Sequence, residues 1–316
     1  MQKLVEVRKR AATVRSIRSV AGTLATVASA KLSRTRERAA GVRAYAERMR
    51  AIVRRQQVAA AAAGIDLVAL SPFLQPHDEV RRVLLVHLAG DRGMCGSYNS
   101  AIDREAGVFI RSRLADGVAV AAIAKGLKGE KYLRRRTEAE VVGAGGWPRG
   151  GVLPDEVDAL CDRLSEAFLS GDADEVWCTY TRFYSPLRRY PTTVRLLPLT
   201  FESADLADVT GAAVALPEQW FYEPDRETIV NELLGIFLRL QVYDVLLESY
   251  AAEQGARMVT MEEATERADR SLQELTVAYN RLRRESITTD LLGVLVGNAV
   301  REAEEHEAAP PAWEDE

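Results

Sequence analysis

The sequence has few of the residues that build disulfide frameworks, metal centres or membrane spans. Three cysteines and three histidines are spread over 316 residues. The cysteines are odd in number, widely separated and form no CxxC pair, which argues against both a disulfide framework and a zinc site. The longest apolar stretch, residues 58–70, is interrupted by Asp66 and is too short to cross a bilayer. We therefore expect reduced, buried thiols and no transmembrane helix.

Catalytic groups are also missing. His77, His87 and His306 share no spacing typical of metal ligands or of a catalytic site, and His87 lies in an apolar run where a core or edge role is more common. No Ser/His/Asp or Cys/His constellation can be proposed, and most carboxylates lie on predicted helix surfaces. We expect no catalytic residue, no metal and no cofactor.

The charge is unevenly distributed along the chain. The formal net charge is only −4, but residues 1–57 carry 15 Lys/Arg against 3 Asp/Glu, and the remaining residues carry 27 against 43. A basic first segment predicts nucleic acid, a membrane surface or an acidic protein as its partner. Arginines are spread along the whole segment from Arg10 to Arg54, whereas a basic-zipper protein confines its charge to one block, which disfavours nucleic acid. The apolar seam is mostly alanine and valine, which disfavours a membrane surface. The favoured partner is an acidic protein that surrounds this helix.

Two long helices are predicted at the ends of the chain. Apolar or small residues recur in steps of three and four from Leu4 to Val53 without a proline, which indicates one continuous helix over residues 1–60. The same pattern covers residues 224–300, where Pro224 suits a first helical turn. Average steps near 3.5 residues predict that the two helices pair as an antiparallel coiled coil.

Between the helices, residues 78–205 alternate short apolar runs with helical patterns. The βαβα order predicts an α/β domain with a mainly parallel sheet. The predicted strands are 81–91, 118–124, 175–183 and 192–200, the helices are 99–115, 126–136 and 155–169, and the loops are 143–151 and 201–217.

A glycine loop follows the first predicted strand, in the sequence GDRGMCGSYNS at residues 90–100. Such a loop at a helix start could cradle phosphate groups, so a nucleotide-using α/β domain is one alternative. However, Gly90, Gly93 and Gly96 form GxxGxxG, and no Gly-Lys-Ser/Thr follows. A structural turn beneath the strand is the favoured interpretation.

Several segments resemble the gamma subunits of F-type ATP synthases. They are EVRKRAATVRSIRSV and VASAKL near the start, DRGMCGSYNS in the glycine loop, and QVYDVLLESYAAEQGARMVTMEEATERAD with LTVAYNRLRRESITTDL near the end. The resemblance covers about residues 1–57, 80–125 and 220–299. The segment 126–219 contributes topology and few motifs.

The resemblance implies a central rotary stalk that transmits torque and does no chemistry of its own. The coiled coil would stand inside a ring of alpha and beta subunits, and the α/β domain would contact the epsilon subunit and the membrane rotor ring. Nucleic acid is not an expected partner. The chain would lie at the cytoplasmic face of the bacterial plasma membrane, and it would be held there only through the other subunits of the complex. The alternative is the gamma subunit of a sodium-translocating F-type ATPase that works mainly as a pump.

Some family positions that contact beta-subunit loops are present here. The matching residues are Arg257, Arg283, Arg284, Thr288 and Asp290. The competing interpretation is that each is an exposed helix residue with no particular partner, since exposed charge pairs are weak. Arg284 replaces the usual Gln and Asp290 the usual Glu, so these contacts are expected to differ in detail.

The chain also departs from the family near its two ends. Gly22 stands in a helix interior, and Leu24 and Thr26 replace methionines that are usual in the family. Residues 301–316 form an acidic tail with seven acids against one Arg. We expect this tail to fray beyond about Ala308.

Overall fold

The computed structural model describes residues 2–62, 64–77, 79–200 and 223–307. These residues belong to two compact units. One unit contains residues 24–261, and the other contains residues 1–23 together with 262–316. Within the described residues, no helix is both long enough and apolar enough to cross a membrane.

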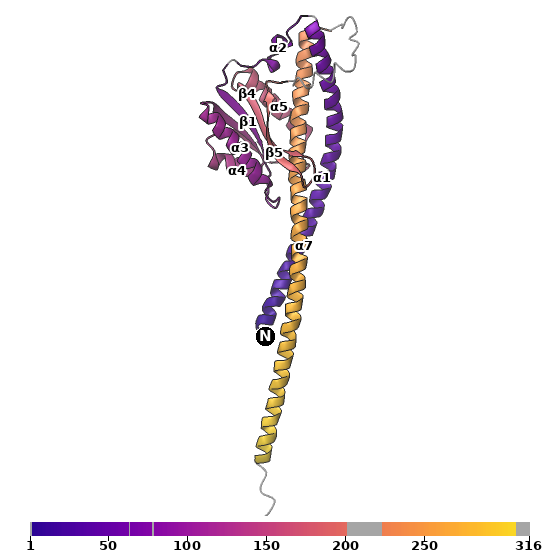
Figure 1. Cartoon of the computed structure of the whole chain (residues 1–316), viewed down its shortest axis with the longest axis vertical. Helices are drawn as coiled ribbons and strands as arrows, with labels where there is room; N and C mark the ends of the chain where they lie inside the picture. Colours follow the sequence, from indigo (N-terminus) through magenta and orange to yellow (C-terminus); the bar gives the residue numbers. More distant parts are fainter. Residues whose placement is uncertain (1, 63, 78, 201–222, 308–316) are drawn as a thin grey trace, which may run out of the picture. The chain divides into compact units, whose positions relative to one another are not determined.

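Two long helices dominate the chain (Figure 1), α1 (Gln2–Ala62) and α7 (Arg226–Glu307). In the 24–261 unit they contact each other in opposite directions. Arg43 Nη2 on α1 lies 2.6 Å from Glu248 Oε1 on α7, and Met49 and Val53 are buried in the same core cluster as Val242. In the other unit, Arg18 on α1 pairs with Asp269 on α7. The predicted antiparallel helix pair is confirmed.

A five-stranded sheet forms the centre of the 24–261 unit, in the order β3-β2-β1-β4-β5. Its first four strands in spatial order are parallel, and β5 runs antiparallel to β4. The mainly parallel sheet is therefore confirmed. The strands are β1 (Arg82–Leu88), β2 (Ala119–Lys125), β3 (Glu140–Gly145), β4 (Glu175–Phe183) and β5 (Arg189–Leu197).

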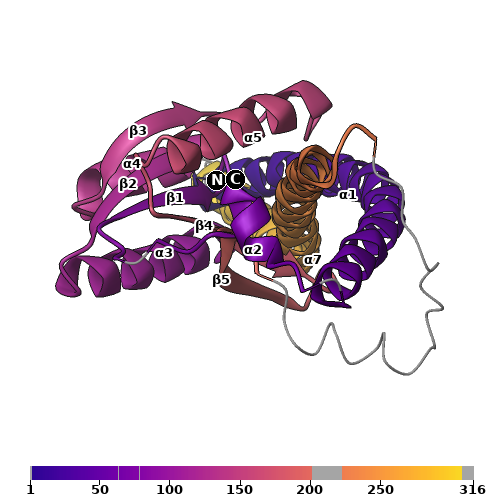
Figure 2. The ribbon, with the colours of Figure 1, turned by 90° about the horizontal axis from the view of Figure 1, so that it is seen from above.

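Helices cover both faces of this sheet (Figure 2). Figure 2 shows α3 (Tyr98–Ala115) on one face and α5 (Pro154–Leu169) on the other. Helix α4 (Leu127–Arg136) packs in the same core as α3. Alternation along β1 explains the two cores. Leu85 points to the core with α3 and α4, whereas Leu84 and Val86 point to the larger core that includes α5, α1 and α7. A short helix α2 (Leu67–Leu70) and a 3-10 turn η1 (Pro72–Leu74) precede β1.

Strand β3 was not predicted, and residues 143–145 are strand rather than loop. The segment is EVVGAG, whose glycines and alanine give little strand propensity. Its strand conformation comes from pairing with β2, a tertiary interaction that local sequence does not report. The pairing shifts register between Ala122 and Ile123, so Val142 is an additional residue opposite β2. The predicted loop at 201–217 lies outside the described residues.

Candidate functional site

The glycine loop connects β1 to α3 and is closed by its own polar groups. Asn99 Oδ1 accepts a hydrogen bond from Gly90 N at 2.9 Å, and Asn99 Nδ2 donates to the Arg92 carbonyl at 3.1 Å. Met94 and Gly96 both have positive φ angles, 61° and 57°. Gly96 also approaches α7, since a Cβ atom there would lie 3.0 Å from Thr260 Oγ1. This conformation suits a turn packed against the long helix, and a purely structural role stays a prediction.

Asp91 links the loop to two neighbouring segments. Its Oδ1 accepts a hydrogen bond from Leu127 N at 3.0 Å, at the start of α4. Its Oδ2 accepts from Trp147 N at 2.9 Å, in the segment after β3. The Trp147 indole in turn donates to the Ala89 carbonyl at 2.6 Å. The loop carboxylate is therefore occupied within the protein, where it holds three segments together at the carboxyl ends of the strands.

Arg257 lies against this loop in a buried ion pair. Its Nη2 lies 2.6 Å from Glu253 Oε1, one turn earlier on α7, and 3.4 Å from the Gly93 carbonyl oxygen. The side chains are 12% and 5% exposed. Burial raises the pKa of Glu253, and the neighbouring Arg257 opposes that rise. Among the residues that the structure describes, Arg257 is the predicted contact residue whose charge is paired within the chain.

A cleft of about 510 Å³ opens beside this ion pair, within the 24–261 unit. Its walls come from α1, the glycine loop, residues 147–149 and α7. Lys31, Arg92 and Arg149 line it, and among the described residues the cationic group of none of the three makes an ion pair or a hydrogen bond. The cleft therefore presents cations from three segments, consistent with the acidic partner predicted from the charge distribution.

The other four predicted contact residues belong to the unit formed by the chain ends. Arg283, Arg284, Thr288 and Asp290 are all exposed on α7. Arg284 Nε donates to the Asn280 carbonyl, and Thr288 Oγ1 donates to the Arg284 carbonyl at 2.9 Å, both within the helix. The structure thus divides the predicted set. Four residues are exposed and form no ion pair with the other described residues, and Arg257 is engaged with the glycine loop.

An exposed apolar helix surface near the end of α7 was missed by our sequence reasoning. Residues 291–300 read LLGVLVGNAV, and every one of them is exposed. The large apolar side chains of residues 287–300 are between 47% and 64% exposed: Ile287, Leu291, Leu292, Val294, Leu295, Val296 and Val300. A helix that is apolar on all sides normally requires cover. The signal was present as an apolar run without polar alternation.

Three polar side chains between the sheet and α3 have the order of a catalytic triad. His87 Nδ1 lies 2.9 Å from Thr179 Oγ1, and His87 Nε2 lies 3.0 Å from Asp103 Oδ1. Both His87 and Thr179 are fully buried. No substrate can reach the Thr179 hydroxyl, so this group joins β1, β4 and α3 as a satisfied polar core. This agrees with the core role predicted for His87.

The cysteines show no sign of redox or metal chemistry. Cys95, Cys161 and Cys178 are free and buried, and burial raises the pKa of each thiol, that of Cys161 to about 12. Thiolates are the reactive form, so these thiols are poor nucleophiles. Within the described part of the chain, no group of three or more Cys, His, Asp or Glu residues is placed to hold a metal ion.

The sequence and structure were then compared with known proteins. The family model described as ATP synthase matches residues 3–299. This chain belongs to the ATP synthase gamma chain family. Membership makes it a gamma subunit of the central stalk, a non-catalytic part of the enzyme, as the resemblance implied.

Relatives match over nearly their whole length. The ATP synthase gamma chain of Dehalococcoides mccartyi strain CBDB1 is 32% identical over 308 residues, which cover 95% of this chain and 99% of the relative. That of Chlorobaculum tepidum is 34% identical over 308 residues, with 94% and 98% covered.

Solved structures show the same fold. A chain of the Tetrahymena thermophila mitochondrial ATP synthase central stalk and c-ring structure matches with a TM-score of 0.55 at 23% identity, covering 78% of this chain and 99% of that one. A Euglena gracilis mitochondrial ATP synthase chain matches with a TM-score of 0.51 at 14% identity, covering 91% and 99%.

Proposed function

We propose that this chain transmits torque between a membrane rotor ring and the catalytic sites of a ring of alpha and beta subunits. The observation that carries the proposal is the exposed apolar end of α7, residues 287–300. Such a surface is costly in water and is typical of a segment enclosed by other proteins. A surrounding ring of subunits would supply that enclosure.

Charge on the helix pair supports the same arrangement. Arg283, Arg284, Thr288 and Asp290 are exposed and free to contact beta-subunit loops. The basic side of α1, together with Lys31, Arg92 and Arg149 in the cleft beside the glycine loop, suits acidic segments of the beta subunits. Arg257 has a different role in this proposal, because it positions the glycine loop against α7 and contributes to partner contact only through that loop.

The α/β part of the 24–261 unit is the candidate contact for the epsilon subunit and the rotor ring. We infer a place at the cytoplasmic face of a bacterial plasma membrane, held there through the complex. The relatives reported above are named as ATP synthase gamma chains without an ion. The sodium-pumping alternative therefore stays a prediction, which depends on the ion-binding carboxylates of the rotor-ring subunit.

Assembly with the catalytic subunits tests the proposal. The chain is to be co-expressed with alpha and beta subunits from the same genome, and the complex purified through a tag on beta. We expect the chain to be retained and to be required for steady ATP hydrolysis by the complex. A chain that never joins the ring contradicts the proposal.

A second set of variants tests the contact residues. Replacing Arg283, Arg284, Thr288 and Asp290 together with alanine should lower the hydrolysis rate of the assembled complex. These side chains are exposed, and within the described part of the chain the hydrogen bonds of Arg284 and Thr288 stay inside α7. The matched control replaces four exposed α7 residues of the same unit, Glu262, Glu266, Arg270 and Gln273, with alanine. Equal losses in the two sets would show that the predicted positions are not specific contacts.

A further inference from the structure

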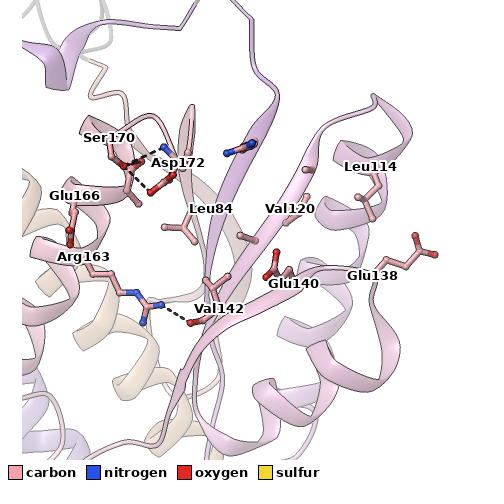
Figure 3. Close-up of a pocket in the computed structure, with 15 residues that line it drawn as sticks. Leu84, Leu114, Val120, Glu138, Glu140, Val142, Arg163, Glu166, Ser170 and Asp172 are labelled. Carbon is pink, nitrogen blue, oxygen red and sulfur yellow. Dashed lines mark hydrogen bonds between the residues drawn. The ribbon is translucent and has the colours of Figure 1, made fainter.

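One cavity of the 24–261 unit lies away from the helix pair, over the amino-terminal ends of three strands (Figure 3). It has a volume of about 750 Å³, within the range of sites that hold a ligand or a partner side chain. Figure 3 shows Leu84 and Val142 at its centre, with Arg163 and Glu166 to one side and Glu140 to the other. We call it the strand-end groove, defined by these residues together with Glu138 and Asp172.

The floor of the strand-end groove is apolar because α5 covers only part of its face of the sheet. Leu84 on β1 and Ala121 on β2 point to this face and border the core that α5 shares with α7. Val142, on the edge strand β3, is 40% exposed there. The groove therefore offers apolar contact beside the core and not only a polar rim.

The rim is acidic, and its charges are not neutralised by the chain itself. Glu138, Glu140, Glu166 and Asp172 come from four separate segments: the α4–β3 connection, β3, α5 and the α5–β4 connection. Within the described residues, none of the four forms an ion pair, and Asp172 alone accepts a side-chain hydrogen bond, from Ser170. The groove has two cationic side chains against these four, so its net charge is negative.

One of those two cations is already used. Arg163 Nη2 donates to the Val142 carbonyl at 2.6 Å, at the residue where β3 shifts register against β2. The guanidinium lies over this face of β3, since a Cβ atom at Gly143 would meet it at 2.5 Å. Arg163 therefore occupies a backbone acceptor at the sheet edge. Addition of a partner strand at this point is disfavoured, and recognition through side chains is favoured.

We propose that the strand-end groove is a docking site for a basic, partly apolar segment of a partner protein in the assembled complex. Cations of that segment pair with the carboxylates on the rim, and its apolar side chains cover Ala121 and Val142 beside the buried Leu84. The occupant is a protein segment because the four carboxylates come from different sides of the groove, and several linked cations are needed to meet them. The inference rests on the proposed assembly with partner subunits, and it does not depend on torque transmission.

Photo-crosslinking in the assembled complex tests this docking site. The full chain carries p-benzoylphenylalanine in place of Val142, and the complex is purified through its beta subunit and irradiated. We expect a crosslink to a partner subunit, and mass spectrometry should place it in a segment rich in Lys or Arg with apolar residues between them. No crosslink, or a crosslink to lipid or to an acidic segment, overturns the proposal.

Charge reversal tests the role of the rim in the same sample. The variant Glu138→Lys/Glu140→Lys should lower the crosslink yield about tenfold, which corresponds to about 1.4 kcal/mol. The matched control is Glu47→Lys/Glu232→Lys, two exposed acids of the same unit that do not line the groove. Circular dichroism verifies that both variants fold. An unchanged yield in the rim variant, or the same loss in the control, overturns the proposal, and neither result affects the test of ring assembly.

Discussion

The ion pair between Glu253 and Arg257 should contribute far more to the free energy of unfolding than its i,i+4 spacing in the sequence indicates. The perturbation is Arg257→Ala, which leaves the Glu253 carboxylate buried without its cation. Both side chains are nearly buried, 12% and 5% exposed, at an N–O distance of 2.6 Å. Breaking such a pair from one side costs about 3 kcal/mol or more, because the remaining charge is uncompensated.

A matched pair on the surface provides the control. Glu130 and Arg134 on α4 have the same i,i+4 spacing and order, an N–O distance of 3.0 Å, and side chains that are 54% exposed for Arg and 29% for Glu. Arg134→Ala should therefore cost only about 0.3–0.5 kcal/mol. Urea unfolding of the full chain, followed by circular dichroism, measures both free energies of unfolding.

The pH dependence gives the prediction a second measurement. Burial raises the pKa of Glu253 in the folded chain, and Arg257 partly offsets this. Removing Arg257 raises the folded pKa further, so the folded state binds its proton more tightly than the unfolded state does. Stability then falls as pH rises from the ordinary Glu pKa to the raised one. The cost of Arg257→Ala should be larger at about pH 7.5 than at about pH 4.5. Equal costs for Arg257→Ala and Arg134→Ala at both values would refute the buried-pair argument.

Three further predictions concern the 24–261 unit. In thermal denaturation, Gly126→Ala should destabilise it by about 3 kcal/mol, because Gly126 has φ +103° and its Cβ would lie 2.1 Å from the Ala89 carbonyl oxygen. Gly41→Ala, with open space around its Cβ, should instead stabilise the unit by about 0.5–1 kcal/mol in the same assay. Asp103→Ala should cost about 1–3 kcal/mol by leaving the buried His87 Nε2 without an acceptor, and an unchanged melting temperature would contradict this. The three buried thiols should react with a chromogenic disulfide reagent only after denaturation, so rapid reaction of the native chain would count against their burial.

Sequence periodicity was sufficient to predict the two long helices, whose apolar residues repeat at helical spacing. The steps of three and four in the two end segments predicted a pair of long helices, and α1 and α7 confirm that pair. Strand β3 could not be predicted in the same way, because its glycines adopt strand geometry through pairing with β2 at the sheet edge. The pairing of β3 with β2 is a tertiary contact, which the local sequence does not show.

The candidate site shows the same limit at the level of side chains. The Glu253–Arg257 spacing is visible in the sequence, but an exposed pair such as Glu130–Arg134 has the same spacing, and only the fold shows which pair is buried. The strand-end groove depends on how much of the sheet α5 leaves uncovered, which no local pattern reports. The apolar run at 291–300 was visible, and its exposure is the new information.

Rotation of the chain inside its ring is the most direct test of torque transmission. The native thiols are buried, so a cysteine placed at the exposed Lys131 on α4 can carry a bead selectively. With the alpha and beta ring fixed to a surface and ATP supplied, single-molecule imaging should show the bead turning continuously in one direction. A fixed ring that contains the chain and hydrolyses ATP at the normal rate while the bead stays still would contradict the account.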